Sequence, residues 1–284
     1  SNLSDNSIII STLVFSIKVS QNCGSIITSI RVCLYSLPGF KKLKEISKEL
    51  NRDLYTFKPI LNSSSQKAIV NSLKWKTIQN LRIKEIYLEN QQLLVIAGKS
   101  GIGKTTLLDN IIGLNNPQKS QWEIELNNKF KRVLGKSINK DIYDLVAYCP
   151  QENVLFESSL KDNLLLKSTP RNKKDIDLKI KNFLKELALE SILLRFKDIN
   201  QNINLSTKPF SGGELQRLCI LRTLLRDKPI EIYDEPTHYL DKSTAKKVSD
   251  FIIENGKKKL LIISTHEEYI MEKADILINL DEIS

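Results

Sequence analysis

The sequence predicts an α/β fold in which parallel strands carry a phosphate-binding loop at one edge of their sheet. Three apolar runs, each followed by polar residues, predict it. Residues 93–97 lead into "GKSGIGKTT" (98–106), and the other two runs lie within 229–241 and 259–267. Short apolar runs of this kind are typical of strands buried on both faces. Because ligands gather at the carboxyl ends of parallel strands, the polar residues are expected to share one site.

The glycine-rich segment sits at a strand-to-helix turn, since a helical pattern begins just after it. Gly98, Gly101 and Gly103 permit backbone angles that let successive N–H groups surround an anion at the positive end of the helix. Lys104 can reach the terminal phosphates of a nucleotide, and the Thr105 hydroxyl can ligate the accompanying Mg²⁺. The alternative is a glycine-rich turn with an unrelated lysine. The full G-x-x-x-x-G-K-[ST] spacing in a strand–loop–helix setting argues against it.

Two acids and a histidine follow the other predicted strands. Asp234 is expected to hold magnesium through water, and Glu235 to act as general base on the attacking water. His266 is predicted to contact the γ-phosphate. Paired acids can also be solvated surface residues, and a lone histidine is usually structural. Their position at strand ends beside a phosphate loop favours the functional interpretation.

A second glycine pair opens the predicted helix within "FSGGELQRLCILRTLLRDKP" (210–229). Ser211, Gly212 and Gly213 could form another anion-binding surface, although the segment alone is better explained by a simple helix N-cap. One nucleotide already fills the first loop. The second surface is therefore predicted to serve a nucleotide held by another subunit.

Composition adds few constraints. The 284 residues include 43 Lys and Arg and 33 Asp and Glu, a net charge of +10 that would suit acidic partners. The lysines are spread along the chain without an aromatic-interleaved basic stripe, so nucleic acid is not an expected partner. The four cysteines form no C-x-x-C pair or metal spacing, which suits a reducing compartment.

The N-terminal part differs in character from the rest. The apolar run 8–17 is too short to span a bilayer, and its continuation to residue 37 is interrupted by Lys18 and Arg31. A membrane helix with a polar side facing other helices is one interpretation, and a soluble amphipathic helix is the other. There is no secretory signal pattern. The start at Ser1 suggests a fragment or a processed chain, and the linker at 62–67 is the predicted domain boundary.

Taken together and in their order along the chain, these segments resemble the nucleotide-binding domain of an ABC ATPase over about residues 67–284. The resemblance rests on six segments: "GKSGIGKTT" is similar to Walker A, "CPQENVLF" to the Q-loop, "FSGGELQR" to the signature motif, "IEIYDE" to Walker B, "HYLD" to the D-loop and "STHE" to the switch-histidine loop. The resemblance implies a P-loop NTPase fold of the ABC type. It would have a mixed or parallel sheet core with a helical subdomain, and a long N-terminal helix would precede it.

The resemblance also implies ATP and Mg²⁺ as cofactors and gives roles by position. Gln151 would ligate magnesium and sense a membrane domain, and Ser211 with Gly213 would contact the γ-phosphate across a head-to-tail dimer. Trp75 is similar to the aromatic residue that stacks on adenine, although a core tryptophan is an equal alternative. The implied sets are catalytic Glu235, His266 and Gln151; metal-binding Thr105, Gln151 and Asp234; and nucleotide-binding Gly98, Ser100, Gly101, Gly103, Lys104, Thr105, Thr106, Trp75, Ser211, Gly212, Gly213 and Asp241.

A second resemblance concerns exporters. Residues 1–61 look like the end of a last transmembrane helix and its cytoplasmic extension, and 154–166 are similar to the segment that receives the coupling helix. This implies an ABC exporter half-transporter in the inner or plasma membrane, with its ATPase domain (67–284) in the cytoplasm. Its partners would be a transmembrane domain in the same chain and a second ABC ATPase domain, identical or a paralogue.

Several residues depart from the family pattern and leave the subfamily open. Phe210 replaces a leucine, Glu231 places a charge in a normally apolar strand, and His238 and Tyr239 replace small residues. Two alternatives to the exporter therefore remain. One is a soluble ABC ATPase acting on nucleic acid or ribosomes, which the net charge suits. The other is an importer ATPase that docks onto a separate permease, in which case residues 8–35 form a soluble helix.

Overall fold

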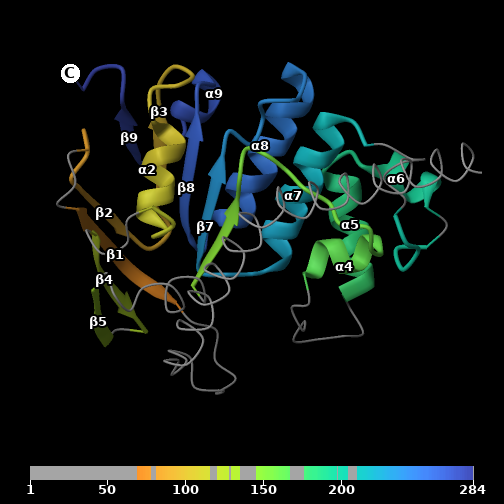
Figure 1. Ribbon diagram of the computed structural model, residues 1–284, viewed down its shortest axis with the longest axis horizontal. Helices are drawn as coiled ribbons and strands as arrows, with labels where there is room; N and C mark the ends of the chain where they lie inside the picture. Colours follow the sequence, from red (N-terminus) through yellow and green to blue (C-terminus); the bar gives the residue numbers. More distant parts are fainter. Residues whose placement is uncertain are drawn as a thin grey trace, which may run out of the picture. The chain divides into compact units, whose positions relative to one another are not determined.

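The computed structural model describes residues 69–77, 81–115, 120–127, 129–134, 145–166, 176–196, 198–203 and 210–283 (Figure 1). The expected N-terminal helix, the apolar segment 8–35 and the linker at 62–67 lie outside these residues. Within the described ranges, no helix is both long enough and apolar enough to cross a membrane.

The centre of the fold is a parallel sheet of five strands, as the sequence predicts. In spatial order the strands are β6 (Val146–Cys149), β7 (Ile230–Asp234), β8 (Leu260–Thr265), β3 (Leu93–Ala97) and β9 (Ile276–Asn279). Every residue of β3, β7 and β8 is buried, which explains their continuous apolar runs. The register pairs Asp234 with Ser264 and Ala97 with Thr265, so the carboxyl ends of β3, β7 and β8 meet at one edge of the sheet.

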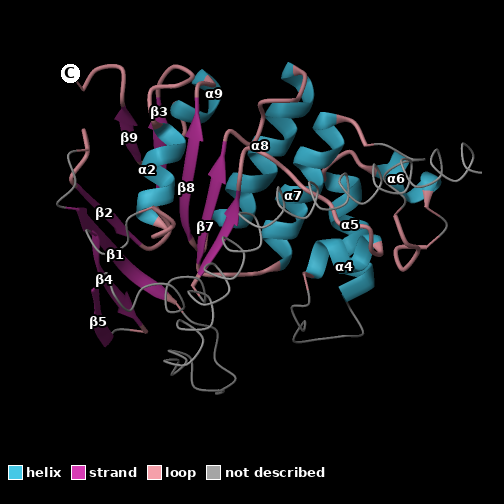
Figure 2. Ribbon diagram, viewed as in Figure 1, coloured by secondary structure: helices cyan, strands magenta, loops and turns pink. Residues whose placement is uncertain are grey.

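A second sheet, which the sequence patterns do not reveal, is antiparallel and has four strands. Their spatial order is β2 (Glu85–Glu89), β1 (Val70–Thr77), β4 (Ser120–Leu126) and β5 (Lys129–Leu134), and Figure 2 shows them as a separate group of strands. Trp75 on β1 lies opposite Trp122 on β4. The indole N–H of Trp122 donates to the Ile111 carbonyl at 2.7 Å, which ties this sheet to the end of the helix α2 (Lys104–Ile111).

The remaining helices pack beside the parallel sheet. The long helix α7 (Gly212–Leu225) contacts β6 and β7 on one side and α4 and α5 on another, and Figure 2 shows α4, α5 and α6 gathered next to it. This group is the predicted helical subdomain. The α/β fold class is confirmed, although the parallel and antiparallel pairings lie in separate sheets. The other helices are α4 (Leu160–Leu165), α5 (Ile176–Glu186), α6 (Glu190–Arg195), α8 (Lys242–Gly256) and α9 (Glu268–Met271).

Glu231, the unexpected charge in β7, has partners inside the sheet. Its side chain is fully buried, with Oε1 at 2.5 Å from the Lys259 ammonium and Oε2 accepting from the Tyr233 hydroxyl at 2.8 Å. Burial raises the pKa of the Glu231 carboxyl, and the charge of Lys259 opposes that rise. A buried carboxylate costs several kcal/mol of desolvation unless a cation and hydrogen bonds satisfy it. Lys259 and Tyr233 explain how β7 tolerates the charge.

This arrangement predicts the effect of removing the cation. Lys259→Met leaves Glu231 buried without its positive partner and is expected to lower the free energy of unfolding by about 3 to 5 kcal/mol. Adding Glu231→Leu to the same chain should recover most of the loss. Urea denaturation of the 284-residue chain measures both, with Lys258→Met at the neighbouring exposed position as control. Equal stabilities of Lys259→Met and the control would contradict the account.

Candidate functional site

The turn between β3 and α2 has the backbone of an anion-binding loop. Gly98, Gly101 and Gly103 have φ of 147°, 80° and 108°, values that residues with a side chain rarely adopt. A Cβ at Gly101 or Gly103 would meet no atom within 4 Å, so these two positions need glycine for the backbone angle. No side chain caps the start of α2 at Gly103. The first N–H groups of the helix are therefore available to an anion.

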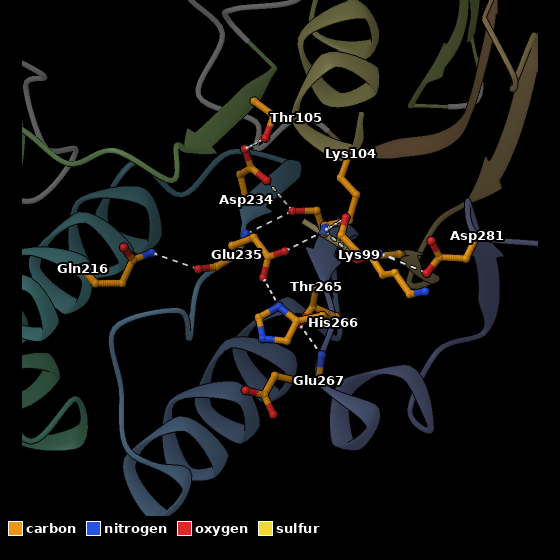
Figure 3. Close-up of polar contacts among 12 residues, drawn as sticks. Lys99, Lys104, Thr105, Gln216, Asp234, Glu235, Thr265, His266, Glu267 and Asp281 are labelled. Carbon is orange, nitrogen blue, oxygen red and sulfur yellow. Dashed lines mark hydrogen bonds and ion pairs between the residues drawn. The ribbon is translucent and has the colours of Figure 1, made fainter. Parts of the chain in front are cut away.

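Lys104 joins this loop to the end of β7. Its buried ammonium donates to the carbonyls of Gly98 at 2.6 Å and Lys99 at 3.1 Å. It also forms an ion pair with Glu235 Oε1 at 2.9 Å, and the side chains of both partners are less than a tenth exposed. Figure 3 shows Lys104 and Glu235 directed toward each other. The lysine is thus held with its charge at the mouth of the loop.

The two predicted metal-binding side chains Thr105 and Asp234 also meet. The Thr105 hydroxyl donates to Asp234 Oδ2 at 2.7 Å (Figure 3), and Asp234 is fully buried at the end of β7. Ser264 of β8 donates to the other carboxylate oxygen of Asp234 and accepts the backbone N–H of Glu235 at 3.0 Å. One serine therefore fixes both acids at this edge of the sheet.

Glu235 and His266 form the next pair. Glu235 has φ of 47°, in the left-handed region that is uncommon for residues other than glycine. Its Oε2 lies 2.9 Å from His266 Nδ1 (Figure 3). The His266 side chain is about half exposed. The carboxylate of Glu235 is thus held between the Lys104 ammonium on one oxygen and the His266 ring on the other.

The structure brings half of the predicted site residues into the lining of one pocket. Gln151, which follows β6, and Glu235, which follows β7, both line it. Ser100, Gly101, Gly103, Lys104, Thr105 and Thr106 complete the lining. The pocket is small and polar. Its side-chain oxygens are ligands of the kind that a hard divalent cation prefers, and its one ammonium suits a phosphate. Among the described residues, no cluster of His, Cys, Asp and Glu forms a ready-made metal site.

The second glycine surface lies in a different pocket. Ser211 N-caps α7, because its hydroxyl accepts the Glu214 N–H at 3.2 Å while the Glu214 carboxylate accepts the Ser211 N–H at 2.9 Å. The simple N-cap interpretation is therefore correct for its local contacts. Ser211, Gly212, Gly213, Arg217, Tyr239, Leu240, Asp241 and Thr244 line this pocket, none of which lines the pocket of the phosphate loop.

Asp241 begins the next helix. Its carboxylate accepts the N–H groups of Ser243 at 3.0 Å and Thr244 at 3.1 Å and so caps α8. Hydrogen bonds from Thr244 and then Ser243 hold the pKa of Asp241 well below its usual range. Asp241 lines the same pocket as Ser211, Gly212 and Gly213, and its own contacts are those of a helix cap.

The prediction that Trp75 stacks on adenine is wrong. Its side chain has no exposed surface and packs in the core between the sheets. Buried and half-buried residues alternate along β1 from Leu73 to Thr77, which puts Leu73, Trp75 and Thr77 on the buried face. A ligand at the phosphate loop therefore has no access to the indole of Trp75. The alternative interpretation, a core tryptophan, is the one that the structure supports.

Three contributing residues were not predicted as site residues, although Ser264 and Gln216 lie within the quoted segments "STHE" and "FSGGELQR". Ser264 bridges the two acids, and Asp281 accepts the N–H of Lys99 at 3.0 Å, which anchors the phosphate loop to the C-terminal turn (Figure 3). Gln216 of α7 is fully buried and accepts from the Asn153 amide, while its own amide donates to the Glu235 carbonyl at 3.5 Å. Each is distant along the chain from the residue that it positions. Only Ser264, which lies opposite Asp234 in the sheet register, could have been found from paired strands.

The comparison with protein families agrees with this geometry. The model of the ABC transporter family matches residues 81–238, more than half of the chain. The chain therefore belongs to the ABC transporter family.

Two curated relatives and one solved structure show what the chain is similar to. It is 34% identical over 173 residues to the glutathione/L-cysteine transport system ATP-binding/permease protein CydC of Escherichia coli K12, covering 61% of this chain and 28% of that protein. It is 31% identical over 200 residues to the pediocin PA-1 transport/processing ATP-binding protein PedD of Pediococcus acidilactici, covering 68% and 26%. The chain thus spans less than a third of the length of either relative.

The structural match is to a bacterial Atm1-family ABC exporter with ATP bound. The TM-score is 0.59, with 20% sequence identity over 83% of this chain and 42% of that chain. At this identity the match supports the fold alone.

Because the family binds nucleotides through its ATP-binding domain, Lys104 has a testable role. Lys104→Ala removes the ammonium at the loop and is expected to weaken binding of a fluorescent ATP analogue at least about tenfold, the loss typical of a charge-assisted contact. Titration followed by fluorescence anisotropy measures this, with the exposed Lys258→Ala as control. Unchanged affinity of the Lys104→Ala chain would contradict the assigned role.

Proposed function

We propose that this chain binds ATP with Mg²⁺, hydrolyses the γ-phosphate bond and thereby powers transport across a membrane as part of an ABC exporter. The observation that carries the proposal is the convergence of Lys104, Thr105 and Glu235 on one polar pocket beside the uncapped start of α2, with the buried Asp234 hydrogen-bonded to Thr105 behind it. Each group suits a separate part of phosphoryl transfer to water.

The pocket fits a nucleotide triphosphate and its cation. The free N–H groups at the start of α2 and the Lys104 ammonium would hold the phosphates. Thr105, Asp234 and Gln151 offer only oxygen ligands, which a hard cation such as Mg²⁺ prefers. When bound, Mg²⁺ neutralises charge that develops on the phosphate oxygens. Thr105 and Asp234 are already in hydrogen-bond contact, so little rearrangement would bring both toward one cation.

Glu235 is suited to act as general base. A phosphate beside Lys104 would compete with the Glu235 carboxylate for the ammonium, freeing one carboxylate oxygen for a water molecule. Glu235 would then take a proton from that water while the water oxygen attacks the γ-phosphorus. The bond between the γ-phosphorus and the oxygen that bridges it to the β-phosphate breaks, and ADP is the leaving group. His266 would hold the other carboxylate oxygen in place and lie near the γ-phosphate.

Two chains would be needed for a complete site. Within one chain, the signature surface of Ser211, Gly212 and Gly213 lines a pocket that shares no residue with the phosphate-loop pocket. This separation supports a head-to-tail dimer in which the signature surface and Asp241 contact the nucleotide of the partner domain, identical or a paralogue. ATP in both sites would favour the closed dimer, and hydrolysis would remove that bias and reopen it.

Membrane transport is the setting that the relatives favour. CydC of Escherichia coli carries an ATP-binding and a permease function under one name, and the name of PedD includes transport. We therefore place this chain at the inner or plasma membrane, with its ATPase domain on the cytoplasmic side and a transmembrane domain in the same polypeptide. An importer ATPase, or a soluble ATPase acting on nucleic acid or ribosomes, has no such support.

The proposal predicts a separation of binding from turnover. Glu235→Gln keeps the shape of the side chain but removes the base, so the 284-residue chain should bind ATP with similar affinity while steady-state phosphate release falls at least about 100-fold. In the presence of ATP and Mg²⁺ the same variant should become a dimer by light scattering. The exposed Glu268→Gln serves as matched control. Persistent multiple-turnover hydrolysis by Glu235→Gln would rule out Glu235 as the base.

A further inference from the structure

Two aromatic rings stand in the turn that joins β7 to α8, where the family pattern has small residues. His238 and Tyr239 are both exposed, Tyr239 to 53%. The turn itself is fixed to the catalytic strand end, because the His238 N–H donates to the Glu235 carbonyl at 3.2 Å. The proposed chemistry assigns no task to either ring.

Tyr239 lies directly against the signature glycines. A Cβ added to Gly212 would be 3.4 Å from two atoms of the Tyr239 ring, and one added to Gly213 would be 3.0 Å from the Tyr239 carbonyl oxygen. The turn therefore touches the start of α7 at two points. The Tyr239 ring lies against Gly212, and the Tyr239 backbone carbonyl lies against Gly213. Any group that presses on the glycine surface also meets the tyrosine ring, which lines the same pocket.

The contacts continue from Tyr239 to the catalytic pair. The rings of His238 and Tyr239 are 4.7 Å apart at 79°, and those of His238 and His266 are 6.4 Å apart at 81°. Both are edge-to-face arrangements, which attract and restrict the relative orientation of the rings. His266 in turn lies 2.9 Å from the Glu235 carboxylate. A series of contacts thus runs from the Gly212 backbone through the side chains of Tyr239, His238 and His266 to Glu235.

We propose that His238 and Tyr239 are positioning residues that link the signature surface to the Glu235–His266 pair of the same chain. A partner domain or its nucleotide settling on Gly212 displaces the tyrosine ring, and the two edge-to-face contacts transmit this displacement to the imidazole of His266. His266 then changes its hold on the Glu235 carboxylate. The proposal rests on the proposed function, since it uses the roles assigned there to His266 and Glu235.

The histidine content of the chain permits a direct test. The sequence contains 2 histidines, His238 and His266, so a 284-residue chain labelled with ¹³C only at histidine Cε1 gives one imidazole signal from each. His238→Gln identifies the His266 signal. Tyr239→Ala should then shift the His266 signal as well as that of His238, whereas Tyr239→Phe, which keeps the ring, should leave both near their original positions. Tyr87→Ala, which removes a tyrosine of similar exposure on β2, is the matched control.

Hydrolysis provides the second readout. Tyr239→Ala and His238→Gln are expected to lower kcat roughly 3- to 10-fold, the range of coupling between residues in contact, with nucleotide affinity changed less than about twofold. Tyr239→Phe should restore the parent kcat. A His266 signal that is the same in Tyr239→Ala and the parent chain overturns the proposal, as does equal kcat for Tyr239→Ala and the parent. A parent chain without ATPase activity would instead overturn the proposed function, and the spectra would still decide whether the rings are coupled.

Discussion

The buried ion pair between Lys104 and Glu235 is the interaction on which the site depends. It joins the phosphate loop to the end of β7 at 2.9 Å, with both side chains almost removed from solvent. Neither charge could stay there alone, because an unpaired buried charge costs several kcal/mol. The ammonium is further satisfied by two loop carbonyls, and the carboxylate by His266. The loop, the acid and the histidine are therefore held as one unit.

The parallel sheet makes this unit possible. Residues 97, 234 and 265 lie at the carboxyl ends of three neighbouring strands, so segments that are more than a hundred positions apart in the chain meet at one edge. The signature surface at the start of α7 belongs to the same chain but lines a separate pocket. In the dimer that we propose, these pockets are two half-sites, and Tyr239 and His238 of the β7–α8 turn lie in contact between the signature glycines and His266.

Much of this arrangement can be predicted from the sequence, for a physical reason. Walker-type loops and strand-end acids carry their chemistry in contiguous segments, so residues 98–106 and 234–235 are recognisable without a structure. The antiparallel sheet as a whole could not be predicted, because its central pairing joins the non-consecutive strands β1 and β4, with Trp75 opposite Trp122. The sequence left Trp75 open between adenine stacking and the core, because sequence position does not reveal which face of β1 is buried. Gln216 and Asp281 were not predicted for a different reason: they act on the backbone groups of Glu235 and Lys99, which belong to other segments of the chain.

A site-directed cross-link tests the central claim most directly, that the phosphate loop of one chain faces the signature surface of another. Chains carrying Ser100→Cys and chains carrying Ser211→Cys, both with Glu235→Gln and with Cys23 and Cys33 replaced by serine, would be mixed and oxidised with and without ATP and Mg²⁺. The account predicts a disulfide between different chains that forms only with ATP, and none when Lys258→Cys replaces Ser211→Cys. ATP binding without any cross-link between these positions would contradict the shared site.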